Sequence, residues 1–481
     1  MKTLQFQQEE LENEKLHEEC GVFGIYSSSK SDVAKSVFYG LFALQHRGQE
    51  GCGICVNDTG KFTSYKDLGL LNEVFDQQTL ENLGQGTACV GHVRYGTTGA
   101  NNRLNCQPLE VHHIKGSLAL CHNGNLTNTT ELRTHLELEG SVFHTSNDSE
   151  VIANAIIKQR LSCDCIEIAV QKAMEQIKGA YSLAIMTQDK MLAVRDPLGM
   201  RPLCIGKTSD GSYVISSESC ALTAIKAQFV RDVEPGEIVV FTRGETLDQI
   251  KIDSIQTLKK AESEKMPKKA LCVFEYIYFA RSDSVIDGVS VQQARQKAGM
   301  FLASEHPVEA DVVIGVPDSG LDAALGYSIQ SKIPYGLGFV KNKYIGRTFI
   351  APQQKERTDK VRIKLNAVEN TVKGKRVVMV DDSIVRGTTS ALIVKLIKEA
   401  GAKEVHVRIS APPFLYPCYY GTDVDSKENL IACHNTIEEI KDIIGADSLG
   451  YLSIENALKI ADNFGKNSFC AACFNGTYPI L

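Results

Sequence analysis

Short apolar runs alternate with amphipathic stretches along the first half of the chain, from Gly21 to about Phe241. The apolar runs predict β-strands at 21–26, 51–56, 88–93, 118–122, 181–187 and 213–217. Stretches with apolar residues at helical spacing predict helices at 150–161 and 166–176. The following stretch, 242–269, is charged and poorly periodic, so we expect it to be a surface connection between two domains.

The pattern changes after residue 270. Apolar runs at 311–316, 376–380 and 404–409 alternate with helical segments, which predicts βαβ units and a parallel sheet. The helix expected at 390–400 has its apolar residues on one face and is followed by Gly401. A parallel sheet of this kind binds ligands at the carboxyl ends of its strands, so candidate site residues are sought there.

Length and composition fit two domains of an ordinary soluble protein. The chain has 481 residues, of which 43% are hydrophobic and 23% charged. It has no apolar run long enough to span a bilayer, and its net charge of −6 argues against nucleic acid as a partner. Residues 1–19 carry six Glu, two Lys and no apolar region, which excludes a secretory signal and makes the cytoplasm the expected compartment. Most of the 15 cysteines should therefore be reduced packing residues.

An acidic and glycine-rich string follows the strand expected at 376–380. Asp381 and Asp382 suit sugar hydroxyls and a divalent cation, and the polar residues up to Thr389 enter a helix N-terminus, which favours a phosphate. The alternative is a strand–loop–helix turn with polar capping residues. The string 381–389 closely resembles the phosphoribosylpyrophosphate (PRPP) motif of type I phosphoribosyltransferases. That resemblance implies PRPP contacts for a set of residues: Asp381, Asp382, Ser383, Arg386, Gly387, Thr388 and Thr389.

Two more segments fit the same family. The string 315–320 also follows a predicted strand and resembles the pyrophosphate loop. In glutamine PRPP amidotransferases its serine, here Ser319, is placed with Asp381 and Asp382 at a Mg²⁺ ion. The basic segment 341–365 resembles the flexible loop of that family, which implies a lid over PRPP; a solvated basic loop is the alternative.

Several strings in the first half resemble class II glutamine amidotransferase domains, which have the N-terminal-nucleophile fold. They occur in family order and begin with Cys20, at 20–25, 46–50, 91–95, 122–125, 147–150 and 195–202. Amide hydrolysis needs a nucleophile, a base and oxyanion stabilisation, and no Cys–His pair is evident. If Cys20 is the mature N-terminus, its α-amine supplies the base, which requires removal of residues 1–19.

The same resemblance gives roles to other residues of the first half. It implies that the Asn123 side chain and the Gly124 N–H form the oxyanion hole. It implies that Arg94 binds the glutamine carboxylate and that Asp148 binds its ammonium group. Arg47 and Gly48 are expected to shape the same glutamine pocket.

Four cysteines match the ligands of the iron–sulfur subgroup of glutamine PRPP amidotransferases: Cys272, Cys418, Cys470 and Cys473. Four thiolates suit one [4Fe–4S] cluster, and a Cys₄ zinc site is the physical alternative. The pair Cys52 and Cys55 has the same spacing but lies in an alternating apolar strand, so we interpret it as packing.

Both halves of the chain therefore indicate one family, the glutamine PRPP amidotransferases. We expect a propeptide at 1–19, an αββα glutaminase domain at 20–250 and a phosphoribosyltransferase domain with a cluster-binding tail at 251–481. The resemblance implies that glutamine is hydrolysed at Cys20 and that ammonia reacts with PRPP to give 5-phosphoribosylamine in purine synthesis. A homotetramer inhibited by purine nucleotides is the family expectation. A PRPP-sensing regulator and another class II amidotransferase are the alternatives.

Overall fold

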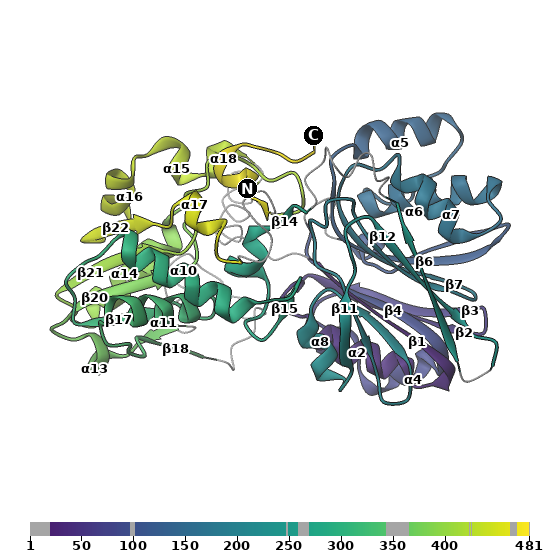
Figure 1. Cartoon of the computed structure of the whole chain (residues 1–481), viewed down its shortest axis with the longest axis horizontal. Helices are drawn as coiled ribbons and strands as arrows, with labels where there is room; N and C mark the ends of the chain where they lie inside the picture. The colour runs from purple at the N-terminus through teal and green to yellow at the C-terminus, as the bar shows by residue number, and fades with distance from the viewer. Residues whose placement is uncertain are drawn as a thin grey trace, which may run out of the picture.

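The computed structural model describes residues 20–96, 102–246, 249–257, 269–342, 365–422, 424, 426–461 and 469–480. They form two lobes, which correspond to the two halves of the chain (Figure 1). The expected propeptide, 1–19, lies outside the described residues, and so does most of the expected lid, from 343 to 364.

Two antiparallel sheets form the first lobe. The seven-stranded sheet has the order β11-β9-β10-β1-β4-β2-β3. Its strands, in chain order, are β1 (Gly21–Ser31), β2 (Gly51–Asp58), β3 (Lys61–Leu68), β4 (Gly86–Arg94), β9 (Cys204–Lys207), β10 (Tyr213–Ser216) and β11 (Gln228–Asp232). The six-stranded sheet has the order β13-β12-β8-β7-β6-β5. Its strands are β5 (Leu109–His113), β6 (Gly116–Leu126), β7 (Gly179–Thr187), β8 (Met191–Arg195), β12 (Glu237–Arg243) and β13 (Ile250–Gln256).

The two sheets pack face to face, and helices cover their outer faces. Val22 and Val90 of one sheet share a buried cluster with Ala119 and Met186 of the other. The outer face of the first sheet packs on α2 (Val33–Ala43), α3 (Leu71–Val74), α4 (Gln77–Leu83) and α8 (Ser219–Ala224). The outer face of the second packs on α5 (Thr129–Leu138), α6 (Asp148–Ser162) and α7 (Ile166–Met174). This order of layers confirms the predicted αββα sandwich.

Strand β2 accounts for the first pair of closely spaced cysteines. Cys52 faces the cluster that contains α2, whereas Cys55 faces the cluster between the sheets. Both are fully buried. The alternation of a strand therefore places the two thiols on opposite faces, which confirms that they are packing residues.

The prediction that 242–269 is a surface connection is wrong in part. Its residues Ile250–Gln256 form β13, which pairs antiparallel with β12 along its whole length. The strand is an edge strand with mostly exposed side chains, so it has no apolar period to read from the sequence. The sheet of the first lobe consequently continues beyond residue 250, to Gln256.

The second lobe contains the predicted parallel sheet. Its order is β17-β20-β21-β22, and all three pairs are parallel. The strands are β17 (Val312–Gly315), β20 (Arg376–Asp381), β21 (Glu404–Ile409) and β22 (Ser448–Tyr451). The principal helices are α10 (Val291–Glu305), α11 (Gly320–Ser331), α14 (Thr388–Glu399) and α16 (Ile437–Ile444). Helix α14 begins at Thr388 rather than Ser390, after Gly387, whose φ of 86° suits glycine.

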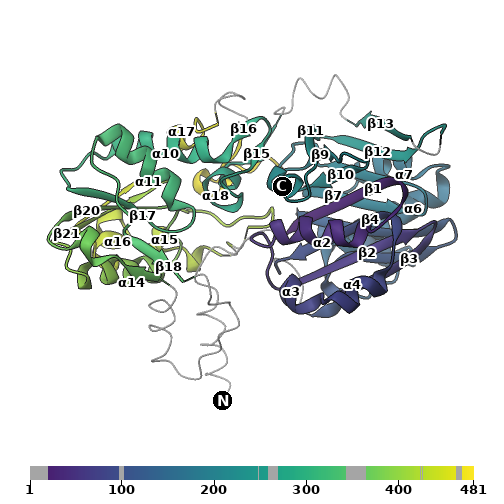
Figure 2. The same cartoon turned by 90° about the horizontal axis from the view of Figure 1, so that it is seen from below.

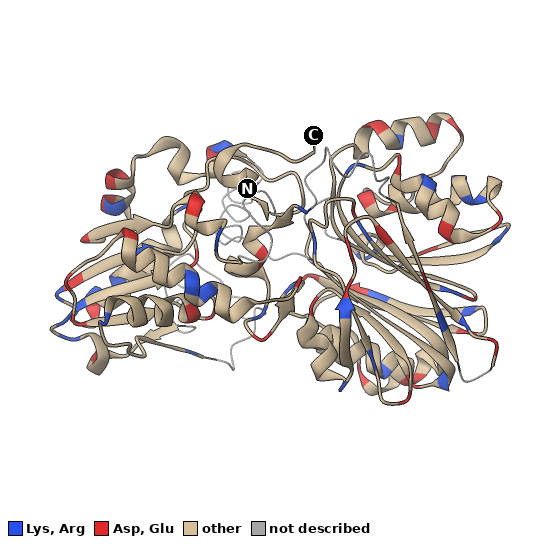
Figure 3. Ribbon diagram, viewed as in Figure 1, with Lys and Arg blue, Asp and Glu red and all other residues tan. Residues whose placement is uncertain are grey.

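The lobes meet along the start and the end of the second half. The N–H groups of Ala270 and Cys272 donate to the carbonyl oxygens of Leu198 at 2.7 Å and Met200 at 3.1 Å. Both views place β15 (Val285–Ile286) on the side of the second lobe that faces the first (Figure 2). Acidic and basic residues are interspersed over both lobes (Figure 3). Within the described residues, no helix is long and apolar enough to cross a membrane.

Candidate functional site

The first lobe has a small pocket at the end of β1. Four of the residues predicted for the glutamine site line it together: Cys20, Arg94, Gly124 and Asp148. The other lining residues are Tyr95, Gln107, His122, Asn147 and Ser149. Strands β1, β4 and β6 and the start of α6 thus bring together residues that lie far apart in the sequence.

Pairing of β1 with β4 fixes the position of Cys20. Gly21 lies opposite Val93, so Cys20 faces the end of β4. Its Sγ is 3.4 Å from both the backbone nitrogen and the carbonyl oxygen of Tyr95. The Cys20 carbonyl accepts a hydrogen bond from Arg47 Nε at 3.1 Å. The residue is largely buried, so its reactive atom faces the pocket rather than open solvent.

Residues 123 and 124 of β6 have the properties expected of oxyanion donors. The Asn123 side chain is fully buried, and neither of its polar atoms has a partner among the described residues. A buried amide that makes no hydrogen bond destabilises the fold. Its N–H and carbonyl groups are therefore available to a bound ligand. Gly124 has a φ of 135°, and a Cβ there would lie 2.1 Å from the Ala180 carbonyl oxygen. Only glycine fits this position.

Asp148 is held as a carboxylate at the first turn of α6, whose N-cap is Asn147. Its Oδ2 accepts from the Leu126 N–H at 3.0 Å, and its Oδ1 lies 3.6 Å from His122 Nδ1. Burial opposes ionisation, but His122 and the hydrogen bonds to the carboxylate outweigh it and lower the Asp148 pKa. The negative charge suits an ammonium group in the pocket.

Five pocket residues had no predicted role, and hydrogen bonds join three of them: Gln107, His122 and Ser149. Gln107 Oε1 accepts from the His122 N–H at 2.6 Å, and Gln107 Nε2 donates to Ser149 Oγ at 3.0 Å. Ser149 Oγ also lies 3.0 Å from His122 Nδ1. His122 lies in a recognised string and could have been proposed from it, whereas nothing around Gln107 in the sequence marks it.

Arg47 and Gly48 do not line the pocket, although both contact residues that do. The Arg47 guanidinium is fully buried and pairs with Glu218 and Glu275. A Cβ on Gly48 would lie 2.6 Å from the Val93 carbonyl carbon and 2.7 Å from that of Arg94. Gly48 therefore allows its loop to approach the end of β4, which carries Arg94.

The second lobe has a pocket at the carboxyl end of β20. Its lining contains Tyr278 and most of the predicted PRPP string: Asp381, Asp382, Ser383, Ile384, Val385, Arg386, Gly387, Thr389 and Ser390. Thr388 begins α14 directly beside it. The loop therefore ends at a helix N-terminus, where unpaired N–H groups and the helix dipole favour a phosphate.

Ser319 lies at the same place as the two acids. Its Oγ donates to Asp382 Oδ2 at 2.5 Å, and the Asp382 N–H donates to Asp381 Oδ1 at 2.9 Å. All three residues are largely buried, and hard oxygen donors of this kind suit Mg²⁺. No group of three or more His, Cys, Asp or Glu side chains in the described part of the chain could hold a metal ion. Mg²⁺ commonly takes one or two carboxylates and completes its shell with substrate phosphates and water, so the donor set fits.

The four predicted cluster cysteines come together where the lobes meet. Cys272 of β14 (Leu271–Cys272) lies opposite Cys470 of β23 (Phe469–Cys470) in a parallel pair. Burial raises the pKa of the Cys473 thiol, and the thiols of Cys272, Cys418 and Cys470 raise it further, so the four lie within electrostatic range. An all-thiolate set fits an iron–sulfur cluster. The arrangement does not converge on a single ion.

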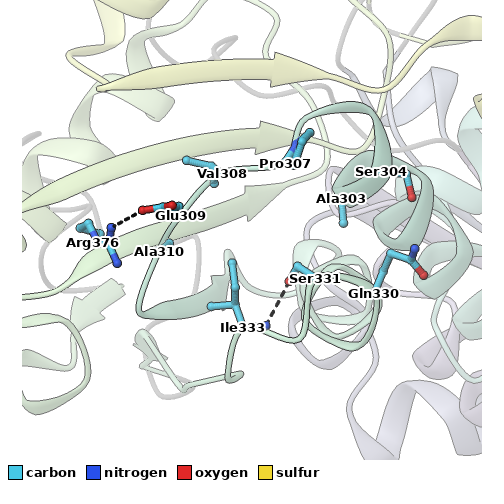
Figure 4. Close-up of a pocket in the computed structure, with 10 residues that line it drawn as sticks. All are labelled: Ala303, Ser304, Pro307, Val308, Glu309, Ala310, Gln330, Ser331, Ile333 and Arg376. Atoms are coloured by element: carbon cyan, nitrogen blue, oxygen red, sulfur yellow. Dashed lines mark hydrogen bonds and ion pairs between the residues drawn. The ribbon is translucent and has the colours of Figure 1, made fainter.

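A separate hollow lies near the amino ends of β17 and β20 (Figure 4). Its most polar feature is Arg376, which pairs with Glu309 at 3.4 Å and with Asp311 at 3.0 Å. The remaining lining residues are mostly small or apolar: Ala303, Ser304, Pro307, Val308, Ala310, Gln330, Ser331 and Ile333. It contains none of the residues predicted from the sequence to act on a substrate.

Family descriptions match parts of both lobes. A glutamine amidotransferase domain matches residues 97–224, and a phosphoribosyl transferase domain matches residues 290–413. These are the two domains expected from the sequence motifs.

Relatives match the chain over nearly its whole length. The amidophosphoribosyltransferase of Methanocaldococcus jannaschii is 50% identical over 465 residues, which is 96% of this chain and 97% of that protein. The amidophosphoribosyltransferase of Bacillus subtilis is 47% identical over 468 residues, with coverage of 96% and 94%. The structure of glutamine PRPP amidotransferase from B. subtilis complexed with ADP and GMP has a TM-score of 0.87 and 46% identity. It covers 96% of this chain and 98% of that chain.

Proposed function

The chain belongs to the amidophosphoribosyltransferase family, and from this premise we propose which residues carry the reaction. The activity is glutamine-dependent amidotransfer to PRPP in purine biosynthesis, with one domain for each substrate. The observation that carries our assignment is the shared pocket of Cys20, Arg94, Gly124 and Asp148. In this proposal Cys20 is the nucleophile, Gly124 is an oxyanion donor, and Arg94 and Asp148 bind the two charged groups of glutamine.

Cys20 is the nucleophile of the glutaminase reaction in our proposal. Its Sγ attacks the glutamine amide carbon, and its own α-amine accepts the thiol proton and returns it to the leaving ammonia. A free α-amine has a pKa of about 7.7–8.0, whereas a peptide nitrogen has no comparable basicity. Residues 1–19 must therefore be removed as a propeptide before Cys20 can act. Water then hydrolyses the thioester to glutamate.

The neighbouring residues stabilise the oxyanion and orient glutamine. The Asn123 amide and the Gly124 N–H donate to the oxyanion. The buried Asn123 amide has no partner among the described residues, which supports this role. Arg94 binds the substrate carboxylate through its planar guanidinium. Asp148 binds the substrate ammonium, and its lowered pKa keeps it ionised at neutral pH. Gly48 supports the pocket through its contact with β4.

In the second lobe we assign the PRPP site to the carboxyl end of β20. Asp381 and Asp382 bind the ribose hydroxyls, and the loop from Ser383 to Thr389, which includes Arg386, Gly387 and Thr388, binds the 5-phosphate. Ser319, Asp381 and Asp382 would hold Mg²⁺, which supplies charge neutralisation to the departing pyrophosphate. Ammonia attacks C1 of PRPP and gives 5-phosphoribosylamine. It must travel inside the protein, because bulk water would protonate it.

Cys272, Cys418, Cys470 and Cys473 would hold one [4Fe–4S] cluster. The parallel pairing of β14 and β23 supports a structural role, since such a cluster would fasten the end of the chain to the start of the second lobe. The similar B. subtilis structure was solved with ADP and GMP, which supports regulation by purine nucleotides. A cytoplasmic homotetramer completes the proposal.

The experiment compares two half-reactions in two variants. The mature protein should start at Cys20 by intact mass and should release pyrophosphate only with PRPP and an ammonia source. Cys20→Ala should lose the reaction with glutamine but keep it with ammonium salts. Asp382→Asn should lose both routes to phosphoribosylamine but keep glutamine hydrolysis. Pyrophosphate release from Cys20→Ala with glutamine would exclude Cys20 as the nucleophile.

A further inference from the structure

A buried ion pair joins the two lobes directly behind the nucleophile. Arg47 of the first lobe and Glu275 of the second form two hydrogen bonds, Nη1 to Oε2 at 2.9 Å and Nη2 to Oε1 at 2.8 Å. Both side chains are fully buried. Glu275 is the first residue of the π-helical turn η2 (Glu275–Phe279). The pair therefore has the planar two-bond geometry that fixes a guanidinium most strongly.

The Nε–H donor of this guanidinium points to the backbone of the nucleophile. Arg47 Nε donates to the Cys20 carbonyl oxygen at 3.1 Å. Nη1 also donates to Glu218 Oε1 at 2.7 Å, and Glu218 in turn contacts His46 Nε2 at 2.8 Å. The guanidinium is thus held by carboxylates of both lobes while its third edge contacts the backbone of Cys20.

The Cys20 carbonyl matters because of where this residue stands in the mature chain. A residue inside a chain is held by peptide bonds on both sides, whereas an N-terminal residue is held on one side only. Rotation about the Cα–C bond of Cys20 moves the thiol and the amine relative to the pocket. A hydrogen bond to its carbonyl oxygen holds the peptide plane that follows Cys20 in one orientation. This restricts rotation about the Cα–C bond.

We propose that Glu275 of the second lobe is a positioning residue for the glutaminase reaction, because it fixes Arg47, which in turn fixes the carbonyl group of Cys20. The proposal rests on the assignment of Cys20 as the N-terminal nucleophile. It means that the glutamine site is completed by a side chain from the phosphoribosyltransferase half. Glu275 touches neither substrate, and it acts through the orientation of the catalytic residue.

A second ion pair between the lobes provides a matched control. Arg195 and Asp287 also form two hydrogen bonds, at 2.8 and 3.1 Å, and both side chains are buried. Arg195 donates in addition to the carbonyl oxygens of Val233, Gly199 and Arg201, none of which lines the glutamine pocket. If a buried ion pair only joins the lobes, loss of either pair should have the same effect.

The test uses Glu275→Gln and Asp287→Asn in the mature, full-length protein. We expect Glu275→Gln to lower kcat for glutamine hydrolysis by about 10- to 100-fold with a nearly unchanged KM. Ammonia-dependent phosphoribosylamine formation should stay within about twofold. Iodoacetamide should alkylate Cys20 more slowly, and the pH profile of this alkylation should change. The reason is that the thiol is no longer held in position for proton transfer to the α-amine. Asp287→Asn should leave all three measurements within about twofold of the parent.

The possible outcomes distinguish the proposed role of Glu275 from the assignment of Cys20 as the nucleophile. Equal losses in both variants, or unchanged glutaminase in Glu275→Gln, would overturn the inference while leaving Cys20 as the nucleophile. Glutamine-dependent activity in Cys20→Ala would overturn the assignment itself. If Glu275→Gln fails to fold, Arg47→Lys replaces it, because lysine keeps the positive charge but lacks the fork that reaches Glu275 and Cys20 together. Full glutaminase activity in Arg47→Lys would then contradict the inference.

Discussion

The Asn125 side chain donates through Nδ2 to the Tyr419 carbonyl oxygen at 3.0 Å, across the boundary between the lobes. Asn125 lies on β6, the strand that carries Asn123. Arg201 Nη2 donates to the next carbonyl oxygen, that of Tyr420, at 2.6 Å. The second lobe is therefore in direct contact with β6, the strand that carries the proposed oxyanion donors Asn123 and Gly124.

Asn123 and Asn125 should respond differently to truncation. We expect Asn123→Ala to lower kcat for glutamine hydrolysis about 10²- to 10³-fold with little change in KM, because it removes a donor used in the transition state. Asn125→Ala loses a backbone contact outside the pocket, so its kcat should change by less than about tenfold. Steady-state glutamate formation measures both. A raised KM with normal kcat in Asn123→Ala would make Asn123 a substrate-binding residue instead.

Gly124→Ala should destabilise the protein far more than Gly84→Ala. Both glycines have positive φ, 135° and 74°, but a Cβ at Gly84 meets open space. We expect Gly84→Ala to cost about 1–2 kcal/mol from backbone strain alone. Gly124→Ala adds a clash with the Ala180 carbonyl oxygen and should cost more than about 3 kcal/mol. Thermal or urea unfolding measures the difference, and equal costs would contradict the geometry of β6.

Asp232 should make the folded protein less stable as the pH rises. Burial and the Asp287 carboxylate raise the pKa of Asp232 from 3.8 to about 6. A carboxyl group with a raised pKa in the folded state stabilises the fold below its unfolded pKa. That contribution is lost between about pH 4 and pH 6.

Asp232→Asn has no charge to bury, so its free energy of unfolding should improve relative to the parent as the pH rises from 4 to 7. The gain should reach about 3 kcal/mol for a shift of this size. Urea unfolding at both pH values checks it. A difference between the two proteins that is independent of pH would show that Asp232 does not titrate in this range.

Iron content should depend on the four cysteines at the junction and on no others. We expect about four iron and four sulfide per chain in protein purified without oxygen. Cys470→Ser should lose most of the iron, because Cys470 pairs in register with Cys272. Cys55→Ser should keep the iron, since Cys55 packs between the sheets of the first lobe. Stoichiometric zinc in the parent protein would favour the alternative Cys₄ site.

The spacing of apolar residues was sufficient to predict the buried strands of the parallel sheet. Strand β21 has the predicted bounds, and β17 and β20 differ from prediction by one residue at an end or both, because each is a buried run with polar neighbours. The edge strand β13 was missed because exposed side chains carry no such period. Tertiary pairing with β12 decides its structure.

The site was accessible from the sequence to the extent that its residues occur in recognisable strings. Gly124 and Asp148 belong to such strings, and both line the pocket that contains Cys20. Gln107 could not be found, since its role depends on hydrogen bonds to His122 and Ser149 that form only in the folded lobe. The partner of Arg47 was equally inaccessible, because Glu275 lies more than 200 residues further along the chain.

The pairing of β14 with β23 also bears on how the protein is made. A ribosome delivers the chain from its N-terminus, so the first lobe is complete once Gln256 has emerged and can fold while synthesis continues. Strand β14 emerges soon afterwards but finds its partner only when Phe469 and Cys470 appear. A chain released before Phe469 therefore carries β14 without its partner strand, which leaves an unpaired strand edge next to the first lobe.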